Sequence, residues 1–168
     1  MSKLSRTHFT VRHATAADVA GIAEVHVASW AAAYSGVIPA EDLAGFTVAR
    51  RAIQWQRMID AGAKVWVALE DDLVIGFVST NGAEVPVLYL HPGWWRLGLG
   101  RTLLRTALAT IRRNGHAEAH LWVLHDNAAA RSFYTALGGR EGETRPVQVG
   151  ATVLTETRYT WLLRVAIV

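Results

Sequence analysis

Residues 88–101 read LYLHPGWWRLGLGR. The pattern predicts a strand that ends at Leu90, a turn, and a helix that begins at Gly98. Glycine at 98 and 100 lets a ligand approach the backbone and leaves the amide N–H groups unobstructed. The first N–H groups of a helix have no internal partner, and the helix dipole adds about half a positive charge there. With Arg96 and Arg101 beside it, the turn predicts a pyrophosphate site.

This turn matches neither of the two common nucleotide-binding motifs. A Walker loop needs Gly-Lys-Ser/Thr, and the stretch contains no lysine. A dinucleotide fingerprint needs a third glycine, where this chain has Leu103. Two glycines before a helix also occur for ordinary capping, so the turn alone leaves both interpretations open.

A second stretch, residues 121–140, reads LWVLHDNAAARSFYTALGGR. It predicts a strand, a helix capped by Asn127, and a helix end at Gly138. Taken singly, Phe133 and Tyr134 also fit a plain structural role as core and half-buried residues.

In order and spacing, the two stretches strongly resemble the GCN5-related N-acetyltransferase (GNAT) superfamily, and the resemblance covers nearly the whole chain. It implies an α/β (α+β) fold with a mixed, mostly antiparallel sheet of six to seven strands and about four helices on both faces. It also implies acetyl-CoA as co-substrate. The implied cofactor contacts are Leu88, Leu90, Arg96, Leu97, Gly98, Leu99, Gly100, Arg101 and Asn127.

The chain departs from the family pattern at three positions. Trp95 stands where the family has Gln or Arg, Gly139 replaces an apolar residue, and Pro86 interrupts the strand nearest the thioester. Trp95 and Pro86 motivate an alternative function, a non-catalytic acyl-CoA-binding or regulatory domain with the same fold.

The resemblance also implies catalytic residues. Tyr134 is the general acid for the leaving thiolate, Glu84 is the general base, directly or through water, and the Leu90 backbone N–H polarises the thioester carbonyl. His91, His120 and His125 also have a suitable intrinsic pKa for a base. The chain has no cysteine, so no thiol can form an acetyl-enzyme, and the amine should attack the thioester directly.

The acceptor is expected to be a small-molecule or peptidyl amine. Neutralising an alkylammonium at pH 7 costs about 4–5 kcal/mol, whereas an α-amine costs only about 1 kcal/mol. The resemblance places Trp30 and Tyr34 in the acceptor wall, although their helical spacing also fits a core. Glu41 and Asp42 either bind an ammonium group or start a helix after Pro39.

Periodicity predicts the element order β-α-α-β-β-β-α-β-α-β-β. A capping box at Thr15–Asp18 begins the first helix, which spans residues 16–31. The second helix spans residues 47–61. The remaining expected elements are strands 9–12, 64–70, 73–79, 85–90 and 119–123, helices 98–113 and 128–137, and two C-terminal strands within 147–163 that turn at Gly150. The second helix should point Val48, Ile53 and Ile59 inward. Trp66, Trp122 and Trp161 should be core residues.

Composition bounds the class of protein. The 168 residues are 51% hydrophobic and carry a net charge of +3, which predicts one globular domain over residues 1–168 and excludes a disordered chain. Arginines are spread along the chain rather than gathered in a stripe, so no nucleic-acid partner is expected. The scattered histidines predict no metal site. Without a secretory signal or a membrane span, a cytoplasmic location is expected. An apolar C-terminal strand, residues 159–168, suggests a homodimer that covers an exposed edge.

Overall fold

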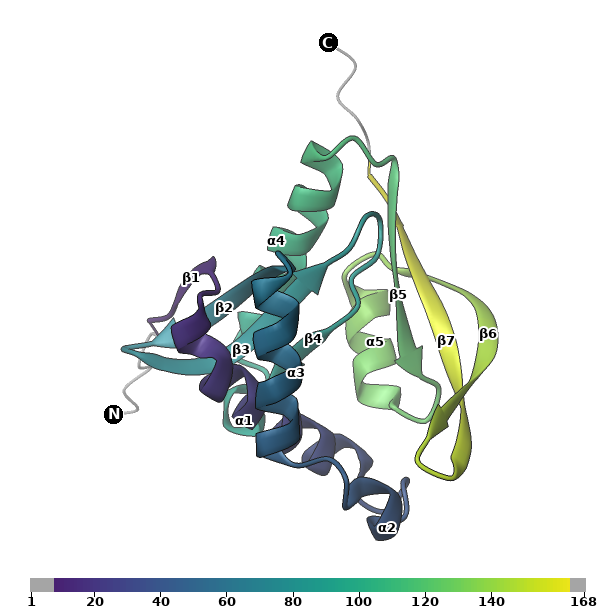
Figure 1. Ribbon diagram of the computed structural model, residues 1–168. Helices are drawn as coiled ribbons and strands as arrows, with labels where there is room; N and C mark the ends of the chain where they lie inside the picture. The colour runs from purple at the N-terminus through teal and green to yellow at the C-terminus, as the bar shows by residue number, and fades with distance from the viewer. Residues whose placement is uncertain (1–7, 164–168) are drawn as a thin grey trace, which may run out of the picture.

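The computed structural model describes residues 8–163, which form seven strands and five α-helices in two sheets (Figure 1). In chain order the elements are β1 (Thr10–His13), α1 (Val19–Tyr34), α2 (Ala40–Leu43), α3 (Val48–Asp60), β2 (Lys64–Glu70), β3 (Leu73–Thr80), β4 (Leu88–Leu90), α4 (Leu99–Arg113), β5 (Glu118–Leu124), α5 (Ala128–Ala136), β6 (Arg140–Val149) and β7 (Thr152–Leu162). This confirms the predicted α/β order, to which the short α2 is an addition.

Helices cover both faces of the first sheet, whose strand order is β1-β2-β3-β4. Val67 and Phe77 pack with α1 and α3 on one face, and Trp66 and Ile75 pack with α4 on the other. The strands of this hairpin are therefore buried on both sides, because successive side chains alternate between two covered faces.

The second sheet has the order β5-β7-β6, and all the strand pairs in both sheets are antiparallel. A single mixed sheet was predicted, but β4 and β5 do not form a ladder with each other. They meet only at one end, where Val85 N–H donates to the His120 carbonyl at 2.9 Å and His120 N–H donates to the Ala83 carbonyl at 3.0 Å. From this junction the strands diverge, which leaves the facing edge of β4 without a ladder partner among the described residues.

Two predicted details of the elements are wrong. The strand expected over residues 85–90 is regular only over Leu88–Leu90, because Pro86 has no N–H to donate. In α3, Val48 and Ile53 are exposed, and the helix buries Trp55 with Ala52, Met58 and Ile59 around it. Residues 52, 55 and 59 lie on one face of the helix, as residues at this spacing do. The most buried side chain on that face is the indole of Trp55, whereas the prediction had placed aliphatic side chains there.

The C-terminal strand β7 does not form an edge, because it lies between β5 and β6. The argument for a partner subunit therefore does not hold over residues 152–162, and residues 164–168 lie outside the described part. The edge strand β6 is mostly exposed and carries charged residues, which disfavours edge-to-edge pairing. Trp122 was expected in the core but is only half-buried, with the Arg145 guanidinium 3.9 Å from its ring centroid.

Candidate functional site

The turn before α4 has the conformation of an anion site. Arg96 and Gly98 have φ of 66° and 85°, and Gly98 is the N-cap residue, with its carbonyl accepting from Thr102 N–H at 3.2 Å. The amide N–H groups of Leu99, Gly100 and Arg101 have no partner among the described residues. Three free N–H groups at the positive end of a 15-residue helix can bind a phosphate group.

Gly100 is required by packing rather than by its dihedral angles. A Cβ atom there would lie 3.0 Å from Phe133 Cζ and 3.2 Å from Leu90 Cδ1. The absence of a side chain lets α4 approach both β4 and α5. The turn is thereby placed directly beside the free edge of β4.

The polar backbone groups of Leu88 and Leu90 point away from β3. Their neighbours pair with β3, because the Val87 carbonyl accepts from Ser79 N–H at 3.1 Å and His91 N–H donates to the Ile75 carbonyl at 2.9 Å. Backbone groups alternate along a strand, so those of Leu88 and Leu90 face the opening between β4 and β5. The Leu90 carbonyl already has a partner, because it accepts from the Trp95 indole N–H at 3.1 Å.

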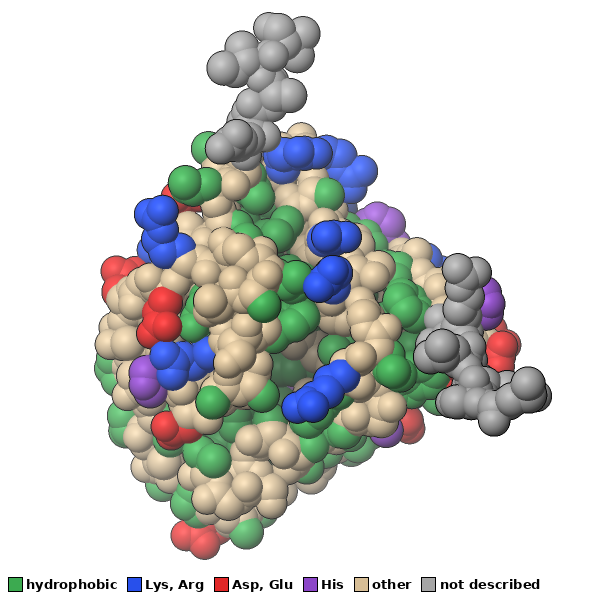
Figure 2. All heavy atoms as spheres, turned by 180° about the vertical axis from the view of Figure 1, so that it is seen from behind, with side chains coloured by type: hydrophobic (Ala, Val, Ile, Leu, Met, Phe, Trp, Pro, Cys, Tyr) green, Lys and Arg blue, Asp and Glu red, His purple; other side chains and the backbone are tan. Residues whose placement is uncertain are grey.

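Basic side chains surround this turn. Arg96, Leu97 and Arg101 are all exposed, and neither arginine belongs to the four ion pairs found among residues 8–163. Figure 2 shows a hollow in the face seen from behind, lined by hydrophobic side chains and edged by basic ones. This positive charge favours an anionic ligand.

Asn127 connects the start of α5 with the end of α1. Its Oδ1 accepts from Ala130 N–H at 3.1 Å and so caps α5, and its Nδ2 donates to the Tyr34 hydroxyl at 3.3 Å. The cap was predicted, whereas the contact with Tyr34 was not. Because an amide nitrogen carries two hydrogens, one donor of Asn127 remains for a ligand.

Tyr134 is buried beside the opening. Its ring lies 5.3 Å from that of Phe133 and 5.9 Å from that of Trp161. Burial raises the pKa of Tyr134 above its usual value, and the nearby hydroxyls of Tyr89 and Tyr34 raise it further. Tyr134, Tyr89 and Tyr34 come from α5, β4 and α1, three elements that are separate in the sequence. Because its pKa is raised, Tyr134 stays protonated at neutral pH.

Glu84 lies at the junction of the two sheets. Its backbone bridges to that of His120, and its carboxylate partly offsets the burial that lowers the His120 pKa. Three residues lie between Glu84 and Leu88, so their Cα atoms are at most about 14 Å apart. Glu84 therefore lies on the segment that leads directly into the free edge of β4.

The expected acceptor residues belong to an aromatic cluster. Trp30 packs edge-on against Tyr34 at 4.7 Å and stacks on Phe46 at 4.5 Å. His26 stacks on Tyr89 at 4.8 Å. Sequence reasoning missed His26, Phe46 and Tyr89, although His26, Trp30 and Tyr34 follow at intervals of four residues on one face of α1. No pattern in the sequence marks Phe46.

His26 is held neutral within this cluster. It is 7% exposed, and its Nδ1 accepts from the Trp55 indole N–H at 3.0 Å, which places the ring proton on Nε2. Burial, aided by the charge of Arg51, lowers the pKa of His26 to about 3.

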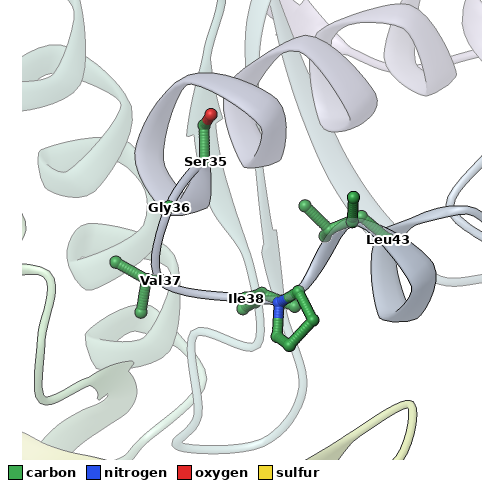
Figure 3. Close-up of a pocket in the computed structure, with 7 residues that line it drawn as sticks. Ser35, Gly36, Val37, Ile38 and Leu43 are labelled. Carbon is green, nitrogen blue, oxygen red and sulfur yellow. The ribbon is translucent and has the colours of Figure 1, made fainter.

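The segment between α1 and α3 is tied to the β6–β7 turn. The Asp42 carboxylate accepts from Ala151 N–H at 2.8 Å and from the Thr152 hydroxyl at 2.5 Å. These donors lower the pKa of Asp42. Of the two roles considered for Asp42, an ammonium contact is therefore disfavoured, because both carboxylate oxygens serve this anchor. A shallow hollow lined by Ser35, Gly36, Val37, Ile38, Pro39, Ala40 and Leu43 lies in the same segment (Figure 3).

Residues 8–163 contain no group of three or more His, Cys, Asp or Glu side chains placed to bind a metal ion. In the same range, no helix is both long and apolar enough to cross a membrane.

Comparisons with known proteins agree with this architecture. The model of the acetyltransferase (GNAT) family matches residues 22–138. The uncharacterized N-acetyltransferase YuaI of Bacillus subtilis is 27% identical over 162 residues, 90% of this chain and 92% of that protein. A spermidine N(1)-acetyltransferase of Thermoplasma acidophilum is 31% identical over 96 residues, 55% of this chain and 57% of that protein. The structure of PaiA N-acetyltransferase from T. acidophilum in complex with coenzyme A has a TM-score of 0.74 at 22% identity, over 92% of this chain and 99% of that one.

Proposed function

The chain belongs to the acetyltransferase (GNAT) family, and we propose that it transfers the acetyl group of acetyl-CoA to a primary amine by direct attack on the thioester. One observation carries the proposal. The free edge of β4 at Leu88 and Leu90 leads into the turn before α4, and both leucines pack in the same hydrophobic cluster as the buried Tyr134. A phosphate-bearing chain that enters at the turn can follow the strand edge and end beside a phenol.

The chain's own groups fit each part of acetyl-CoA. The amides of residues 98–101 would bind the pyrophosphate, with Arg96 and Arg101 supplying positive charge and Leu97 and Leu99 completing the turn. The backbone of Leu88 and Leu90 would pair with the amides of the extended pantetheine arm, as an added strand does. The second N–H of Asn127 would reach the same arm. A neighbouring fold solved with coenzyme A supports this choice of ligand.

The reaction balances without an enzyme-bound acetyl group. The neutral amine nitrogen attacks the thioester carbon, the C–N bond forms, and the oxyanion accepts a hydrogen bond from the Leu90 N–H. The C–S bond then breaks, and Tyr134 protonates the thiolate and regains a proton from solvent. Because its pKa is raised, Tyr134 donates only as the C–S bond breaks, when the sulfur is most basic.

The amine must lose protons in this scheme. Glu84 would accept one, directly or through water, from its position at the sheet junction. An α-amine costs only about 1 kcal/mol to neutralise at pH 7, whereas an alkylamine costs about 4–5 kcal/mol. An acceptor with a weakly basic amine therefore needs Glu84 least.

Calorimetry with acetyl-CoA, followed by thiol release with a panel of amines, tests the proposal. Tyr134→Phe should lower kcat about 10- to 100-fold while leaving acetyl-CoA affinity within twofold. Tyr159→Phe is the matched control. It removes a second buried phenol, one that donates to Glu141 at 3.1 Å, and should leave kcat unchanged.

The outcomes separate two functions. No heat and no thermal shift at millimolar acetyl-CoA would overturn any acyl-CoA function. Binding without thiol release for any amine would favour the non-catalytic acyl-CoA-binding domain. That alternative is supported by the Trp95 indole, which occupies the Leu90 carbonyl.

A further inference from the structure

Arg51, in the aromatic cluster, has no ion-pair partner among residues 8–163. It is half-buried in the first turn of α3, with its Cζ 3.8 Å from the centroid of Phe46. Its Nη1 donates to the neutral Gln54 Oε1 at 2.6 Å. Its Nε–H is buried and has no acceptor in the described part of the chain.

Four acidic side chains in the described part of the chain pair with arginines other than Arg51. The four ion pairs take up Asp18, Glu141, Glu143 and Glu156, and none involves Arg51. Glu156, which contributes to the environment of both Tyr34 and Tyr89, is held by Arg145 at 2.9 Å. Burial lowers the pKa of Arg51, and the neighbouring Arg50 lowers it further.

A continuous set of aromatic contacts connects Arg51 to Tyr89 on β4. Phe46 stacks on Trp30 and meets the edge of His26 at 5.3 Å. His26 in turn stacks on Tyr89, which lies between Leu88 and Leu90 on β4. Side chains alternate across the strand, so Tyr89 faces α1 and the acceptor side, opposite the face that packs on α4.

Arg51 and the aromatic side chains next to it favour an acceptor that carries an anionic group. A half-buried cation without a partner is costly, and a carboxylate that accepts from a guanidinium offsets that cost through a strong, charge-assisted hydrogen bond. Aromatic rings beside it favour an apolar side chain. A polycation would be repelled by the positive charge of Arg51.

We propose that the acceptor is an amine that also carries a carboxylate, an amino acid with an apolar side chain, and that Arg51 binds this carboxylate. The inference rests on the proposed acetyl transfer. It agrees with the mechanism, because an α-amine is the acceptor that is least costly to neutralise. It also distinguishes this chain from the relative named a spermidine acetyltransferase.

Matched pairs of acceptors test the inference. Thiol release is measured with L-phenylalanine, L-phenylalaninamide and 2-phenylethylamine, and with L-methionine and 3-(methylthio)propylamine. Each is assayed with the unchanged protein, Arg51→Gln, Arg51→Lys and Arg50→Gln. Arg50 is the exposed neighbour, so Arg50→Gln removes the same charge without reaching the cluster. Comparing ratios between variants cancels the intrinsic difference in amine basicity within each pair.

The unchanged protein and Arg50→Gln should prefer the carboxylated member at least 10-fold in kcat/KM, through KM. Arg51→Gln should reduce that ratio to within threefold of one, and Arg51→Lys should keep part of it. Spermidine should be a poor acceptor that improves in Arg51→Gln. Equal or better rates with the decarboxylated amines, or equal changes in Arg50→Gln and Arg51→Gln, would overturn the inference while acetyl transfer stands. No thiol release with any acceptor would instead count against the proposed function.

Discussion

The two sides of the opening between β4 and β5 are built in different ways. On the proposed cofactor side, residues 88–101 supply mainly backbone groups from one continuous stretch. On the proposed acceptor side, two helices, a loop and a strand supply the side chains of His26, Trp30, Tyr34, Phe46, Arg51 and Tyr89.

The difference suggests that side-chain substitutions affect the two sides differently. A turn that offers backbone groups suits the part of a ligand that does not change, because its hydrogen bonds do not depend on which side chains it carries. A wall made of side chains can change with the acceptor. Changes on one side should therefore alter the affinity for acetyl-CoA, and changes on the other should alter acceptor KM or local stability.

The largest effect is expected at Gly100. Gly100→Val would place side-chain atoms against Phe133 and Leu90, where even a Cβ is 3.0 Å from the nearest atom, and would displace the turn amides. We expect acetyl-CoA affinity to fall at least 100-fold by calorimetry, with a loss of stability of about 1–3 kcal/mol from overpacking.

The control is Gly142→Val in β6, where a Cβ has only an ordinary contact at 3.7 Å. That variant should bind acetyl-CoA normally. If Gly100→Val remains folded and binds acetyl-CoA as tightly as the unchanged protein, the amides of the turn do not carry the affinity.

The sequence predicted several local features of the fold well. The capping by Gly98 and Asn127, the β2–β3 hairpin and the end of α4 each depend on residues within a few positions of one another. Capping residues and turn residues determine such features, and they do not depend on contacts with distant parts of the chain.

The acceptor side could not be predicted in the same way. Trp55 and His26 are 29 residues apart, Asn127 and Tyr34 are 93 apart, and Thr152 and Asp42 are 110 apart. No local pattern encodes such pairs. The separation of the two sheets likewise depends on residues far apart in the sequence, because their strands are joined at the Glu84–His120 bridge.

The next largest effect is a loss of folding stability at acid pH that is caused by the burial of His26. Its pKa is lower in the folded protein, about 3, than the usual 6.5 of the unfolded chain. The unfolded chain therefore takes up the proton first, so stability is fully present above pH 6.5 and is lost as the pH falls toward 3. Between pH 7 and pH 5 the loss should be about 2 kcal/mol.

Denaturant unfolding of His26→Gln at both pH values checks this expectation. Glutamine can still accept from Trp55 but cannot be protonated, so the difference in unfolding free energy between pH 7 and pH 5 should shrink by about 2 kcal/mol. His116→Gln should keep the original difference. A His26→Gln protein with the same pH dependence as the unchanged chain would show that His26 is not the titrating group.

A smaller effect, confined to the acceptor side, is expected at Asp42. Asp42→Ala removes the acceptor for Ala151 N–H and the Thr152 hydroxyl and so frees residues 35–43 from the β6–β7 turn. We expect acceptor KM to rise about fivefold to tenfold, with the affinity for acetyl-CoA unchanged. Glu41→Ala, at the exposed neighbouring position, should change neither quantity. A parallel loss of cofactor affinity in Asp42→Ala would contradict the separation of the two sides.

The smallest effect is expected at Trp95, the side chain that occupies part of the free strand edge. Its indole N–H donates to the Leu90 carbonyl at 3.1 Å, which is the acceptor that a pantetheine amide would use. Trp95→Phe keeps an aromatic ring and removes the donor, so acetyl-CoA no longer has to displace it. Since a hydrogen bond contributes about 1 kcal/mol net, acetyl-CoA affinity should rise about threefold to fivefold. Trp122→Phe, on a ring covered by Arg145, should leave the affinity unchanged. A weaker affinity in Trp95→Phe would mean that the indole stabilises the end of β4 in its binding conformation rather than competing with the ligand.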